Sequence, residues 1–247
     1  MAPVKTYRDE AIVLRCHDLG EADRIITMFS RNHGKIRGVA KGVRKTKSRF
    51  GARVEPFSMI DVQLYKGRTL DVVTQVETLN QYGRNIALDY DLYTAASAIV
   101  ETADRLQGDE GEPDPQQYLL LHGALHAIAV RSHAPDLVMN SYLLRAMALS
   151  GWALAIFDCA RCGAEGPHAA FHVQAGGAVC DDCRPVGSTT PSVETWQLMG
   201  ALLSGDWKIA DAASTPARRA AASLVAAYVQ WHLEKQVKSL RLVTIEG

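Results

Sequence analysis

The first 80 residues alternate between apolar and polar positions with a period of two, which is typical of β-strands with one buried face. Ile12, Leu14 and Cys16, for example, share one face of such a strand. The alternation predicts five strands, at about residues 12–17, 25–29, 35–39, 57–64 and 70–77. Glycine-containing polar segments at 19–23 and 66–68 predict hairpin turns between the first two and the last two strands.

Five short antiparallel strands in a segment of this length predict a small closed barrel. Among such barrels, the OB-fold is the one most commonly used to bind single-stranded nucleic acid. An SH3-like barrel is the alternative architecture.

After Asn80 the apolar positions recur at spacings of three and four residues, which predicts amphipathic helices. An acidic segment with glycine and proline at 108–115 divides the first two of them. Thr190 and Thr215, each followed by proline, are predicted N-caps of two later helices that run to about Leu203 and Lys235. The earlier helices are expected over Leu92–Leu106, Gln116–Val130 and Leu137–Leu149.

These patterns together predict an α+β protein. We expect a five-stranded OB-fold barrel at residues 1–80 and an α-helical domain at 81–247. A cysteine-containing segment at about 157–184 is inserted between the helices and has the composition of a four-cysteine zinc finger.

Four cysteines form two pairs with the spacing of a structural zinc site. Cys159 and Cys162 make the first C-x2-C pair, and Cys180 and Cys183 make the second, with 17 residues between the two pairs. Each pair places two thiolates on one turn, and two such turns complete a tetrahedron that leaves no position open for water. We therefore expect one structural Zn²⁺ that cross-links the chain.

Disulfide bonds and an iron–sulfur cluster are the alternative uses of these cysteines. The chain begins without an apolar leader segment and has no run of about 18 uncharged apolar residues. We therefore expect a cytoplasmic protein, in a reducing compartment that disfavours disulfides. His168 and His172 lie between the pairs and are expected to be bystanders, and Cys16 is expected to be an inert buried thiol.

Charge is balanced over the whole chain but unevenly distributed. Nine of the 27 basic residues fall between residues 31 and 54, where there is no acid, which leaves 18 basic against 27 acidic residues in the rest. We call residues 31–54 the basic segment and expect it to contact the phosphates of a polyanion. Its predicted phosphate-binding residues are Arg31, Lys35, Arg37, Lys41, Arg44, Lys45, Lys47, Arg49 and Arg53.

No catalytic motif accompanies the basic segment. The sequence has no Gly-x4-Gly-Lys-Ser/Thr phosphate loop and no carboxylate cluster with nuclease-like spacing, so we do not expect an enzyme. Phe50, between Arg49 and Arg53, is the best candidate for an exposed ring on which a base could stack. A zinc-stabilised nucleic-acid hydrolase and an RNA-binding zinc-ribbon protein are the alternative functions.

Three separate stretches of the chain resemble the RecO family of recombinational DNA-repair proteins. The amino-terminal signature is LGEADRIITMFS at Leu19–Ser30, followed by Gly34–Phe50 and Glu55–Phe57. The cysteine pairs, the second preceded by Gly176–Val179, and the stretch Leu233–Leu242 are similar to the family's zinc-containing carboxyl half. The resemblance covers essentially the whole chain.

The resemblance implies a mediator of recombination that binds single- and double-stranded DNA and anneals complementary strands. It further implies that RecR is a partner in loading RecA onto DNA coated with single-strand-binding protein, and that the helical domain contacts the acidic tail of that protein. Arg131, Arg145, Lys235, Lys238 and Arg241 are candidate contacts for the tail. Such a protein is expected in the cytoplasm, in association with the nucleoid.

Overall fold

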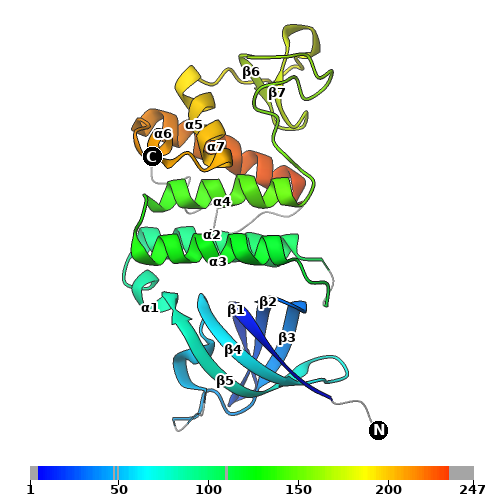
Figure 1. Ribbon diagram of the computed structural model, residues 1–247, viewed down its shortest axis with the longest axis vertical. Helices are drawn as coiled ribbons and strands as arrows, with labels where there is room; N and C mark the ends of the chain where they lie inside the picture. Colours follow the sequence, from blue (N-terminus) through cyan, green and yellow to red (C-terminus); the bar gives the residue numbers. More distant parts are fainter. Residues whose placement is uncertain (1–4, 47, 49, 109–110, 234–247) are drawn as a thin grey trace.

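A computed structural model describes residues 5–46, 48, 50–108 and 111–233. Five strands form a closed barrel in the order β1-β2-β3-β5-β4, and a short 3-10 helix, η1 (Gly51–Val54), connects β3 to β4. This is the expected OB-fold barrel, at the lower end of the molecule in Figure 1. Its strands are β1 (Thr6–Leu19), β2 (Asp23–Ser30), β3 (Gly34–Ala40), β4 (Ser58–Tyr65) and β5 (Asp71–Gln81).

The barrel is not fully antiparallel, which corrects the expectation from sequence. β3 and β5 are parallel and are paired through only two positions, Gly38 with Asp71 and Val39 with Val72. The physical reason is topological: an odd number of strands cannot close with every neighbouring pair antiparallel. The short parallel pair is the seam of the barrel, and the first residues of β3 lie beyond it.

Strand β1 is buried on both faces where it crosses beneath the helices. Ala11 and Val13 lie in the core inside the barrel, whereas Ile12 and Leu14 belong to the core that fills the helical domain. Phe29 of β2 joins this second core, where its ring lies edge-on to that of Tyr118 with the centroids 5.9 Å apart. The barrel and the helices are therefore joined by a continuous apolar contact.

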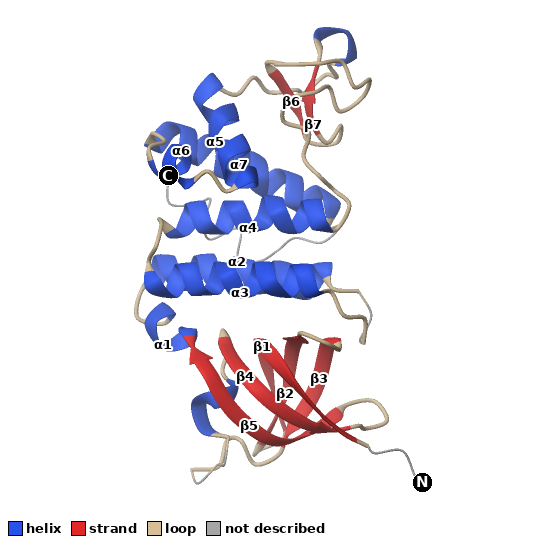
Figure 2. Ribbon diagram, in the orientation of Figure 1, coloured by secondary structure: helices blue, strands red, loops and turns tan. Residues whose placement is uncertain are grey.

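The helices are stacked above the barrel, with α2 and α3 nearest to it, α4 next, and α5, α6 and α7 beyond α4 (Figures 1 and 2). Asp89 and Asp114 accept hydrogen bonds from backbone N–H groups at the starts of α2 and α3, which fixes where these helices begin. The helices are α1 (Tyr82–Ile86), α2 (Tyr90–Leu106), α3 (Pro115–Val130), α4 (Pro135–Leu149), α5 (Val193–Ser204), α6 (Trp207–Asp211) and α7 (Thr215–His232).

Two predicted helix starts were wrong, and two short helices were not predicted. The N-cap of α5 is Ser192 rather than Thr190, and that of α7 is Ser214 rather than Thr215. In each case a serine hydroxyl accepts the N–H of a residue three positions later, which the Thr-Pro pattern did not reveal. Helices α1 and α6, each of five residues, are too short to produce a periodic pattern.

The cysteine-containing insertion lies at the end of the molecule opposite the barrel (Figure 1). It is built on a small hairpin of β6 (Ala170–His172) and β7 (Gly177–Val179), followed by the 3-10 helix η2 (Asp181–Cys183). Its own buried core consists of Cys159, Ala170 and Val179. None of the helices within the described ranges is long and apolar enough to cross a membrane.

Candidate nucleic-acid interface and metal centre

The basic segment covers β3, the loop that follows it and η1. Two hydrogen bonds fix the loop after β3 against the turn between β1 and β2. Gly42 N–H donates to Asp23 Oδ1 over 2.7 Å, and Arg44 N–H donates to the carbonyl oxygen of Ala22 over 3.0 Å. The backbone from which the loop cations project is therefore well defined.

Lys41 and Lys45 are the cations of this segment that are best placed to contact phosphate. Both side chains are exposed, and the structure gives neither an ion-pair partner among the residues it describes. Arg44 is paired with Asp18 at 3.2 Å, and Arg31 is paired with Glu10 at 3.3 Å. Exposed pairs of this kind are weak, so a phosphate can replace the carboxylate.

Of four further cations of the basic segment, two lie on the barrel surface and two are outside the described residues. Arg37 is half-buried on the outer face of β3, and Arg53 is exposed on η1, where it donates to the carbonyl oxygen of Val76 over 3.3 Å. Lys47 and Arg49 lie outside the described residues.

Lys35 belongs to the junction between barrel and helices, which corrects its assignment to an exposed phosphate-binding surface. Its side chain is only 17% exposed, and Nζ lies 3.2 Å from Asp104 Oδ1 and donates to the Asp104 carbonyl oxygen over 2.8 Å. Arg15 binds the other oxygen of the same carboxylate at 3.0 Å. Lys35 therefore ties β3 to α2, and its charge is already compensated.

Acidic side chains beside the basic segment, one on β1 and one directly after η1, reduce the positive charge of this face. Arg24 of β2 binds both Asp18 at 3.0 Å and Glu55 at 2.8 Å. These acids lie outside the basic segment in sequence but beside it in space. The count over residues 31–54 therefore overstates the net charge of the surface, and the two exposed loop lysines matter more than the total.

The ring of Phe50 is buried, so the expectation that it offers an exposed stacking surface was wrong. It is 4% exposed and packs in the core of the barrel with Val43 and Val54. The arginines on either side of it in sequence gave no indication of this burial. Cys16 is an inert thiol as expected: it donates to the Val54 carbonyl over 3.0 Å, and burial raises its pKa to about 12.

The four cysteines of the insertion converge on one point. Their Sγ atoms all lie within 4.8 Å of one another, and Cys162 Sγ is 3.8 Å from Cys180 Sγ. Sulfurs at the corners of a tetrahedron with metal–sulfur bonds of about 2.3 Å are separated by about 3.8 Å, so the cluster has the dimensions of a tetrahedral thiolate site. Gly163, with a φ of 73°, makes the turn after the first pair, where Gly163 N–H donates to the Cys159 carbonyl.

The environment of the sulfurs favours a bound cation. Backbone N–H groups, first that of Cys180 and then that of Cys162, lower the pKa of Cys159 to about 6. The neighbouring thiols of Cys180 and Cys162 raise the pKa of Cys183 to about 12. One thiolate forms readily, whereas full ionisation of the cluster requires compensating positive charge. These four residues could hold a metal ion, and the composition of the cluster is compatible with zinc.

His168 and His172 are outside the cluster. His168 Nε2 lies 2.9 Å from the carbonyl oxygen of Ala164, and His172 Nδ1 accepts the N–H of Ala175 over 3.2 Å. Each histidine therefore supports a local turn of the insertion.

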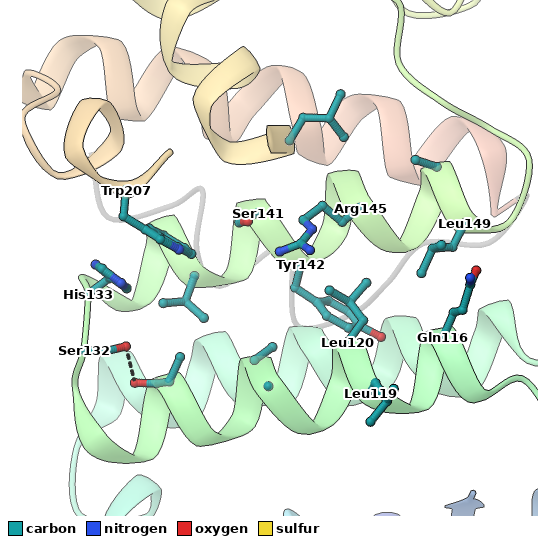
Figure 3. A pocket seen from close by; sticks show the side chains of 16 residues that line it. Gln116, Leu119, Leu120, Ser132, His133, Ser141, Tyr142, Arg145, Leu149 and Trp207 are labelled. Carbon is teal, nitrogen blue, oxygen red and sulfur yellow. Dashed lines mark hydrogen bonds between the residues drawn. The ribbon is translucent and has the colours of Figure 1, made fainter. Parts of the chain in front are cut away.

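A groove of about 890 Å³ lies between α3 and α4, and sequence reasoning missed it. Leu119 and Leu149 line it and are 58% and 42% exposed. Figure 3 shows Arg145 facing the space between the two helices, with His133 and Trp207 at one end. The two rings are stacked with centroids 3.9 Å apart. The groove is therefore apolar, with Arg145 as an exposed cation and no acid among its lining residues.

Family models match both halves of the chain. The model described as recombination protein O N terminal matches residues 1–82, which include the whole barrel. The model described as recombination protein O C terminal matches residues 87–241, which include the helical stack and the four cysteines. Together with the OB-fold barrel and the cysteine cluster, these matches show that the chain belongs to the RecO family and has a role in DNA recombination and repair.

Proposed function

We propose that this protein is a recombination mediator that holds DNA strands on its barrel and performs no covalent chemistry. It binds single- and double-stranded DNA without sequence specificity and anneals complementary strands. With RecR, it helps to load RecA onto DNA coated with single-strand-binding protein. The observation that carries this proposal is the pair of exposed lysines, Lys41 and Lys45, on the loop that follows β3, neither of which has an ion-pair partner among the described residues.

A mechanism for annealing follows from contacts to phosphate alone. Lysine and arginine replace the counterions of the DNA backbone, and this contact carries no information about the bases. Two strands held near one protein with their repulsion reduced, and with their bases free, can then pair. The buried ring of Phe50 is consistent with a surface that leaves the bases unoccupied.

Charge reversal at Lys41 and Lys45 tests this proposal. The double variant Lys41→Glu/Lys45→Glu should anneal two complementary oligonucleotides at least about tenfold more slowly at low salt, because two phosphate contacts become repulsive. Annealing is followed by fluorescence quenching between labelled strands. Arg219→Glu, which reverses an exposed charge on α7, is the matched control and should anneal at the wild-type rate. Equal rates for all three proteins would contradict the proposal.

We propose that Cys159, Cys162, Cys180 and Cys183 hold one Zn²⁺ with a structural role. When bound, the ion would cross-link the two C-x2-C turns of the insertion. The thiolates would fill its coordination shell, so the site would stabilise the insertion without activating water.

We further propose that the groove between α3 and α4 receives the acidic tail of single-strand-binding protein. An apolar channel with one exposed cation and no acid in its lining suits a peptide that combines apolar and acidic side chains. Of the candidate tail contacts, Arg145 lies in this groove, whereas Arg131 forms an ion pair with Asp89 at 2.9 Å. Lys235, Lys238 and Arg241 are outside the described residues.

The groove proposal predicts that a substitution in the groove weakens peptide binding and leaves DNA binding unchanged. Arg145→Glu should weaken binding of a peptide with the tail sequence about tenfold or more, because an attraction becomes a repulsion in a partly apolar groove. Its affinity for free DNA should not change. Isothermal titration calorimetry measures the first quantity and fluorescence anisotropy the second. Unaltered peptide affinity would place the tail elsewhere.

A further inference from the structure

A second cavity, of about 360 Å³, lies at the seam of the barrel beside the first residues of β3. It exists because β3 and β5 are paired only at Gly38–Val39, so the start of β3 has no neighbouring strand on that side. The cavity is formed by four segments that are distant in sequence: the chain before β1, the start of β3, the loop after β4, and the loop between α2 and α3.

A buried aspartate fixes the orientation of His33 in this cavity. The Asp9 carboxylate has no exposed surface, accepts N–H and Nδ2–H bonds from Asn32, and lies 2.7 Å from His33 Nδ1. Burial alone would raise the pKa of Asp9, but these hydrogen bonds, first that from His33, lower it overall. Because an ionised carboxylate only accepts, Nδ1 carries a hydrogen. Nε2 is then the ring nitrogen left for a ligand, since no residue within the described ranges bonds to it.

Two lysines supply positive charge to the same cavity. Lys66 Nζ lies 3.5 Å from Asp71 Oδ2 and 5.7 Å from the centre of the Tyr7 ring. The Tyr7 hydroxyl also donates to Asp71, so this carboxylate is shared and Lys66 keeps donors for another acceptor. Lys5 lines the cavity with an exposed side chain. Lys35 also lines it, but its ammonium group is bound to Asp104.

We propose that this cavity binds one phosphate group of a nucleic-acid strand through Lys5, Lys66 and His33 Nε2. A phosphate oxygen can accept from each ammonium group, and also from Nε2 when the ring carries a hydrogen on both nitrogens, the imidazolium form that Asp9 and a bound phosphate both favour. An imidazolium and two ammonium groups around one concave site suit a single compact anion. The cavity also lies at one end of a path that a nucleic-acid strand can follow along the barrel. β3 spans about 23 Å at about 3.3 Å per residue, and it leads from this cavity past Arg37 to Lys41.

Binding of a phosphate group in the cavity does not depend on the proposed DNA-binding function. The identification of DNA as the source of that phosphate rests on it. Two sources of the phosphate are possible, an internal phosphodiester and a terminal phosphomonoester. The site could not be predicted from the sequence, because its cations are single residues separated by whole strands.

The first test uses inorganic phosphate and the intact chain. Addition of sodium phosphate should shift the ring resonances of His33 in an NMR spectrum, relative to sodium chloride at equal ionic strength. The shift should be lost in Lys66→Met, a substitution at an exposed side chain that leaves the Asp9–His33 pair in place. An identical response of His33 to phosphate and to chloride would overturn the proposal.

The second test uses oligothymidylates with and without a 5′-phosphate. Lys5→Met/Lys66→Met should weaken binding of at least one of them by more than about tenfold, because tenfold is the loss expected for a single charged contact and this variant removes two. A loss for both strands identifies an internal phosphodiester, and a loss confined to the phosphorylated strand identifies a terminal phosphate. His33→Asn, whose amide can still donate to Asp9, should show the same selectivity. If all variants have wild-type thermal stability and unchanged affinity for both strands, the proposal that the cavity binds a DNA phosphate is refuted. If His33 responds to phosphate but the protein does not bind DNA at all, only the proposed DNA-binding function is refuted.

Discussion

Replacing Cys159 with serine should abolish metal binding and unfold the insertion while the helical stack remains folded. Phe171 of the insertion packs in the core of the helical domain, but the separate core around the cysteines consists of only Cys159, Ala170 and Val179. That is too little apolar surface to hold the rest of residues 157–184 together without a cross-link. Structural zinc sites contribute about 10 kcal/mol or more of apparent binding free energy. Loss of the zinc therefore removes more free energy than the remaining packing of the insertion can supply.

The measurements for this variant are metal content and amide hydrogen exchange. We expect one zinc per wild-type chain and none in Cys159→Ser, with protection of the Phe171 and Ala178 amides reduced by at least about 3 kcal/mol. These amides donate to Thr189 and Ala155 and report on the insertion directly. Cys16→Ser is the control and should keep its zinc, because Cys16 bonds to the Val54 carbonyl in the barrel, far from the insertion. A Cys159→Ser protein with a full complement of zinc would show that the cluster is not the metal site.

Replacing Gly34 with alanine should destabilise the contact between the barrel and the helical domain. Gly34 has a φ of 63°, and a Cβ at this position would overlap the carbonyl oxygen of Glu112 in the loop between α2 and α3. Backbone atoms cannot move aside as a side chain can, so the loop must leave the barrel or the turn before β3 must distort. We expect a loss of about 4 kcal/mol in the free energy of unfolding, of which about 1 kcal/mol comes from the positive φ.

Gly20 provides a matched control for the backbone conformation. Its φ is 60°, and a Cβ there would meet no atom within 4 Å. Gly20→Ala should therefore lose only about 1 kcal/mol, the cost of the left-handed conformation itself. Urea denaturation measures both variants, and the difference between them isolates the contact with Glu112. Equal losses would mean that the loop does not press on the barrel in solution.

The alternation of apolar residues was sufficient to predict the five strands, because each strand has a face inside the barrel. It did not predict the parallel seam, which follows from closure of the barrel and not from the pattern within a strand. Nor did it distinguish the two buried faces of β1, where Ala11 and Val13 point into the barrel and Ile12 and Leu14 into the helical core. Contact with the helices decides that difference.

The cysteine cluster could be predicted because its four residues occur as two close pairs whose spacing is itself the signal. The nucleic-acid surface was harder to predict, since charge in a sequence window does not show where each side chain points. Lys35 and Phe50 lie in the same basic segment as Lys41, yet the first is bound to Asp104 and the second is in the barrel core. Partners such as Asp18 and Asp104 come from other elements, and only the tertiary structure brings them together.

The salt dependence of binding to a single-stranded oligonucleotide tests the central claim most directly. Six of the described cations in the basic segment lie outside the junction with the helices, namely Arg31, Arg37, Lys41, Arg44, Lys45 and Arg53. If all six contact phosphate, a plot of the logarithm of the affinity, measured by fluorescence anisotropy, against the logarithm of salt concentration should have a slope of about −4. The slope for Lys41→Glu/Lys45→Glu should be smaller in magnitude by at least about 1.4. A slope near zero, or one that the two substitutions leave unchanged, would contradict the claim that this face of the barrel holds DNA by its phosphates.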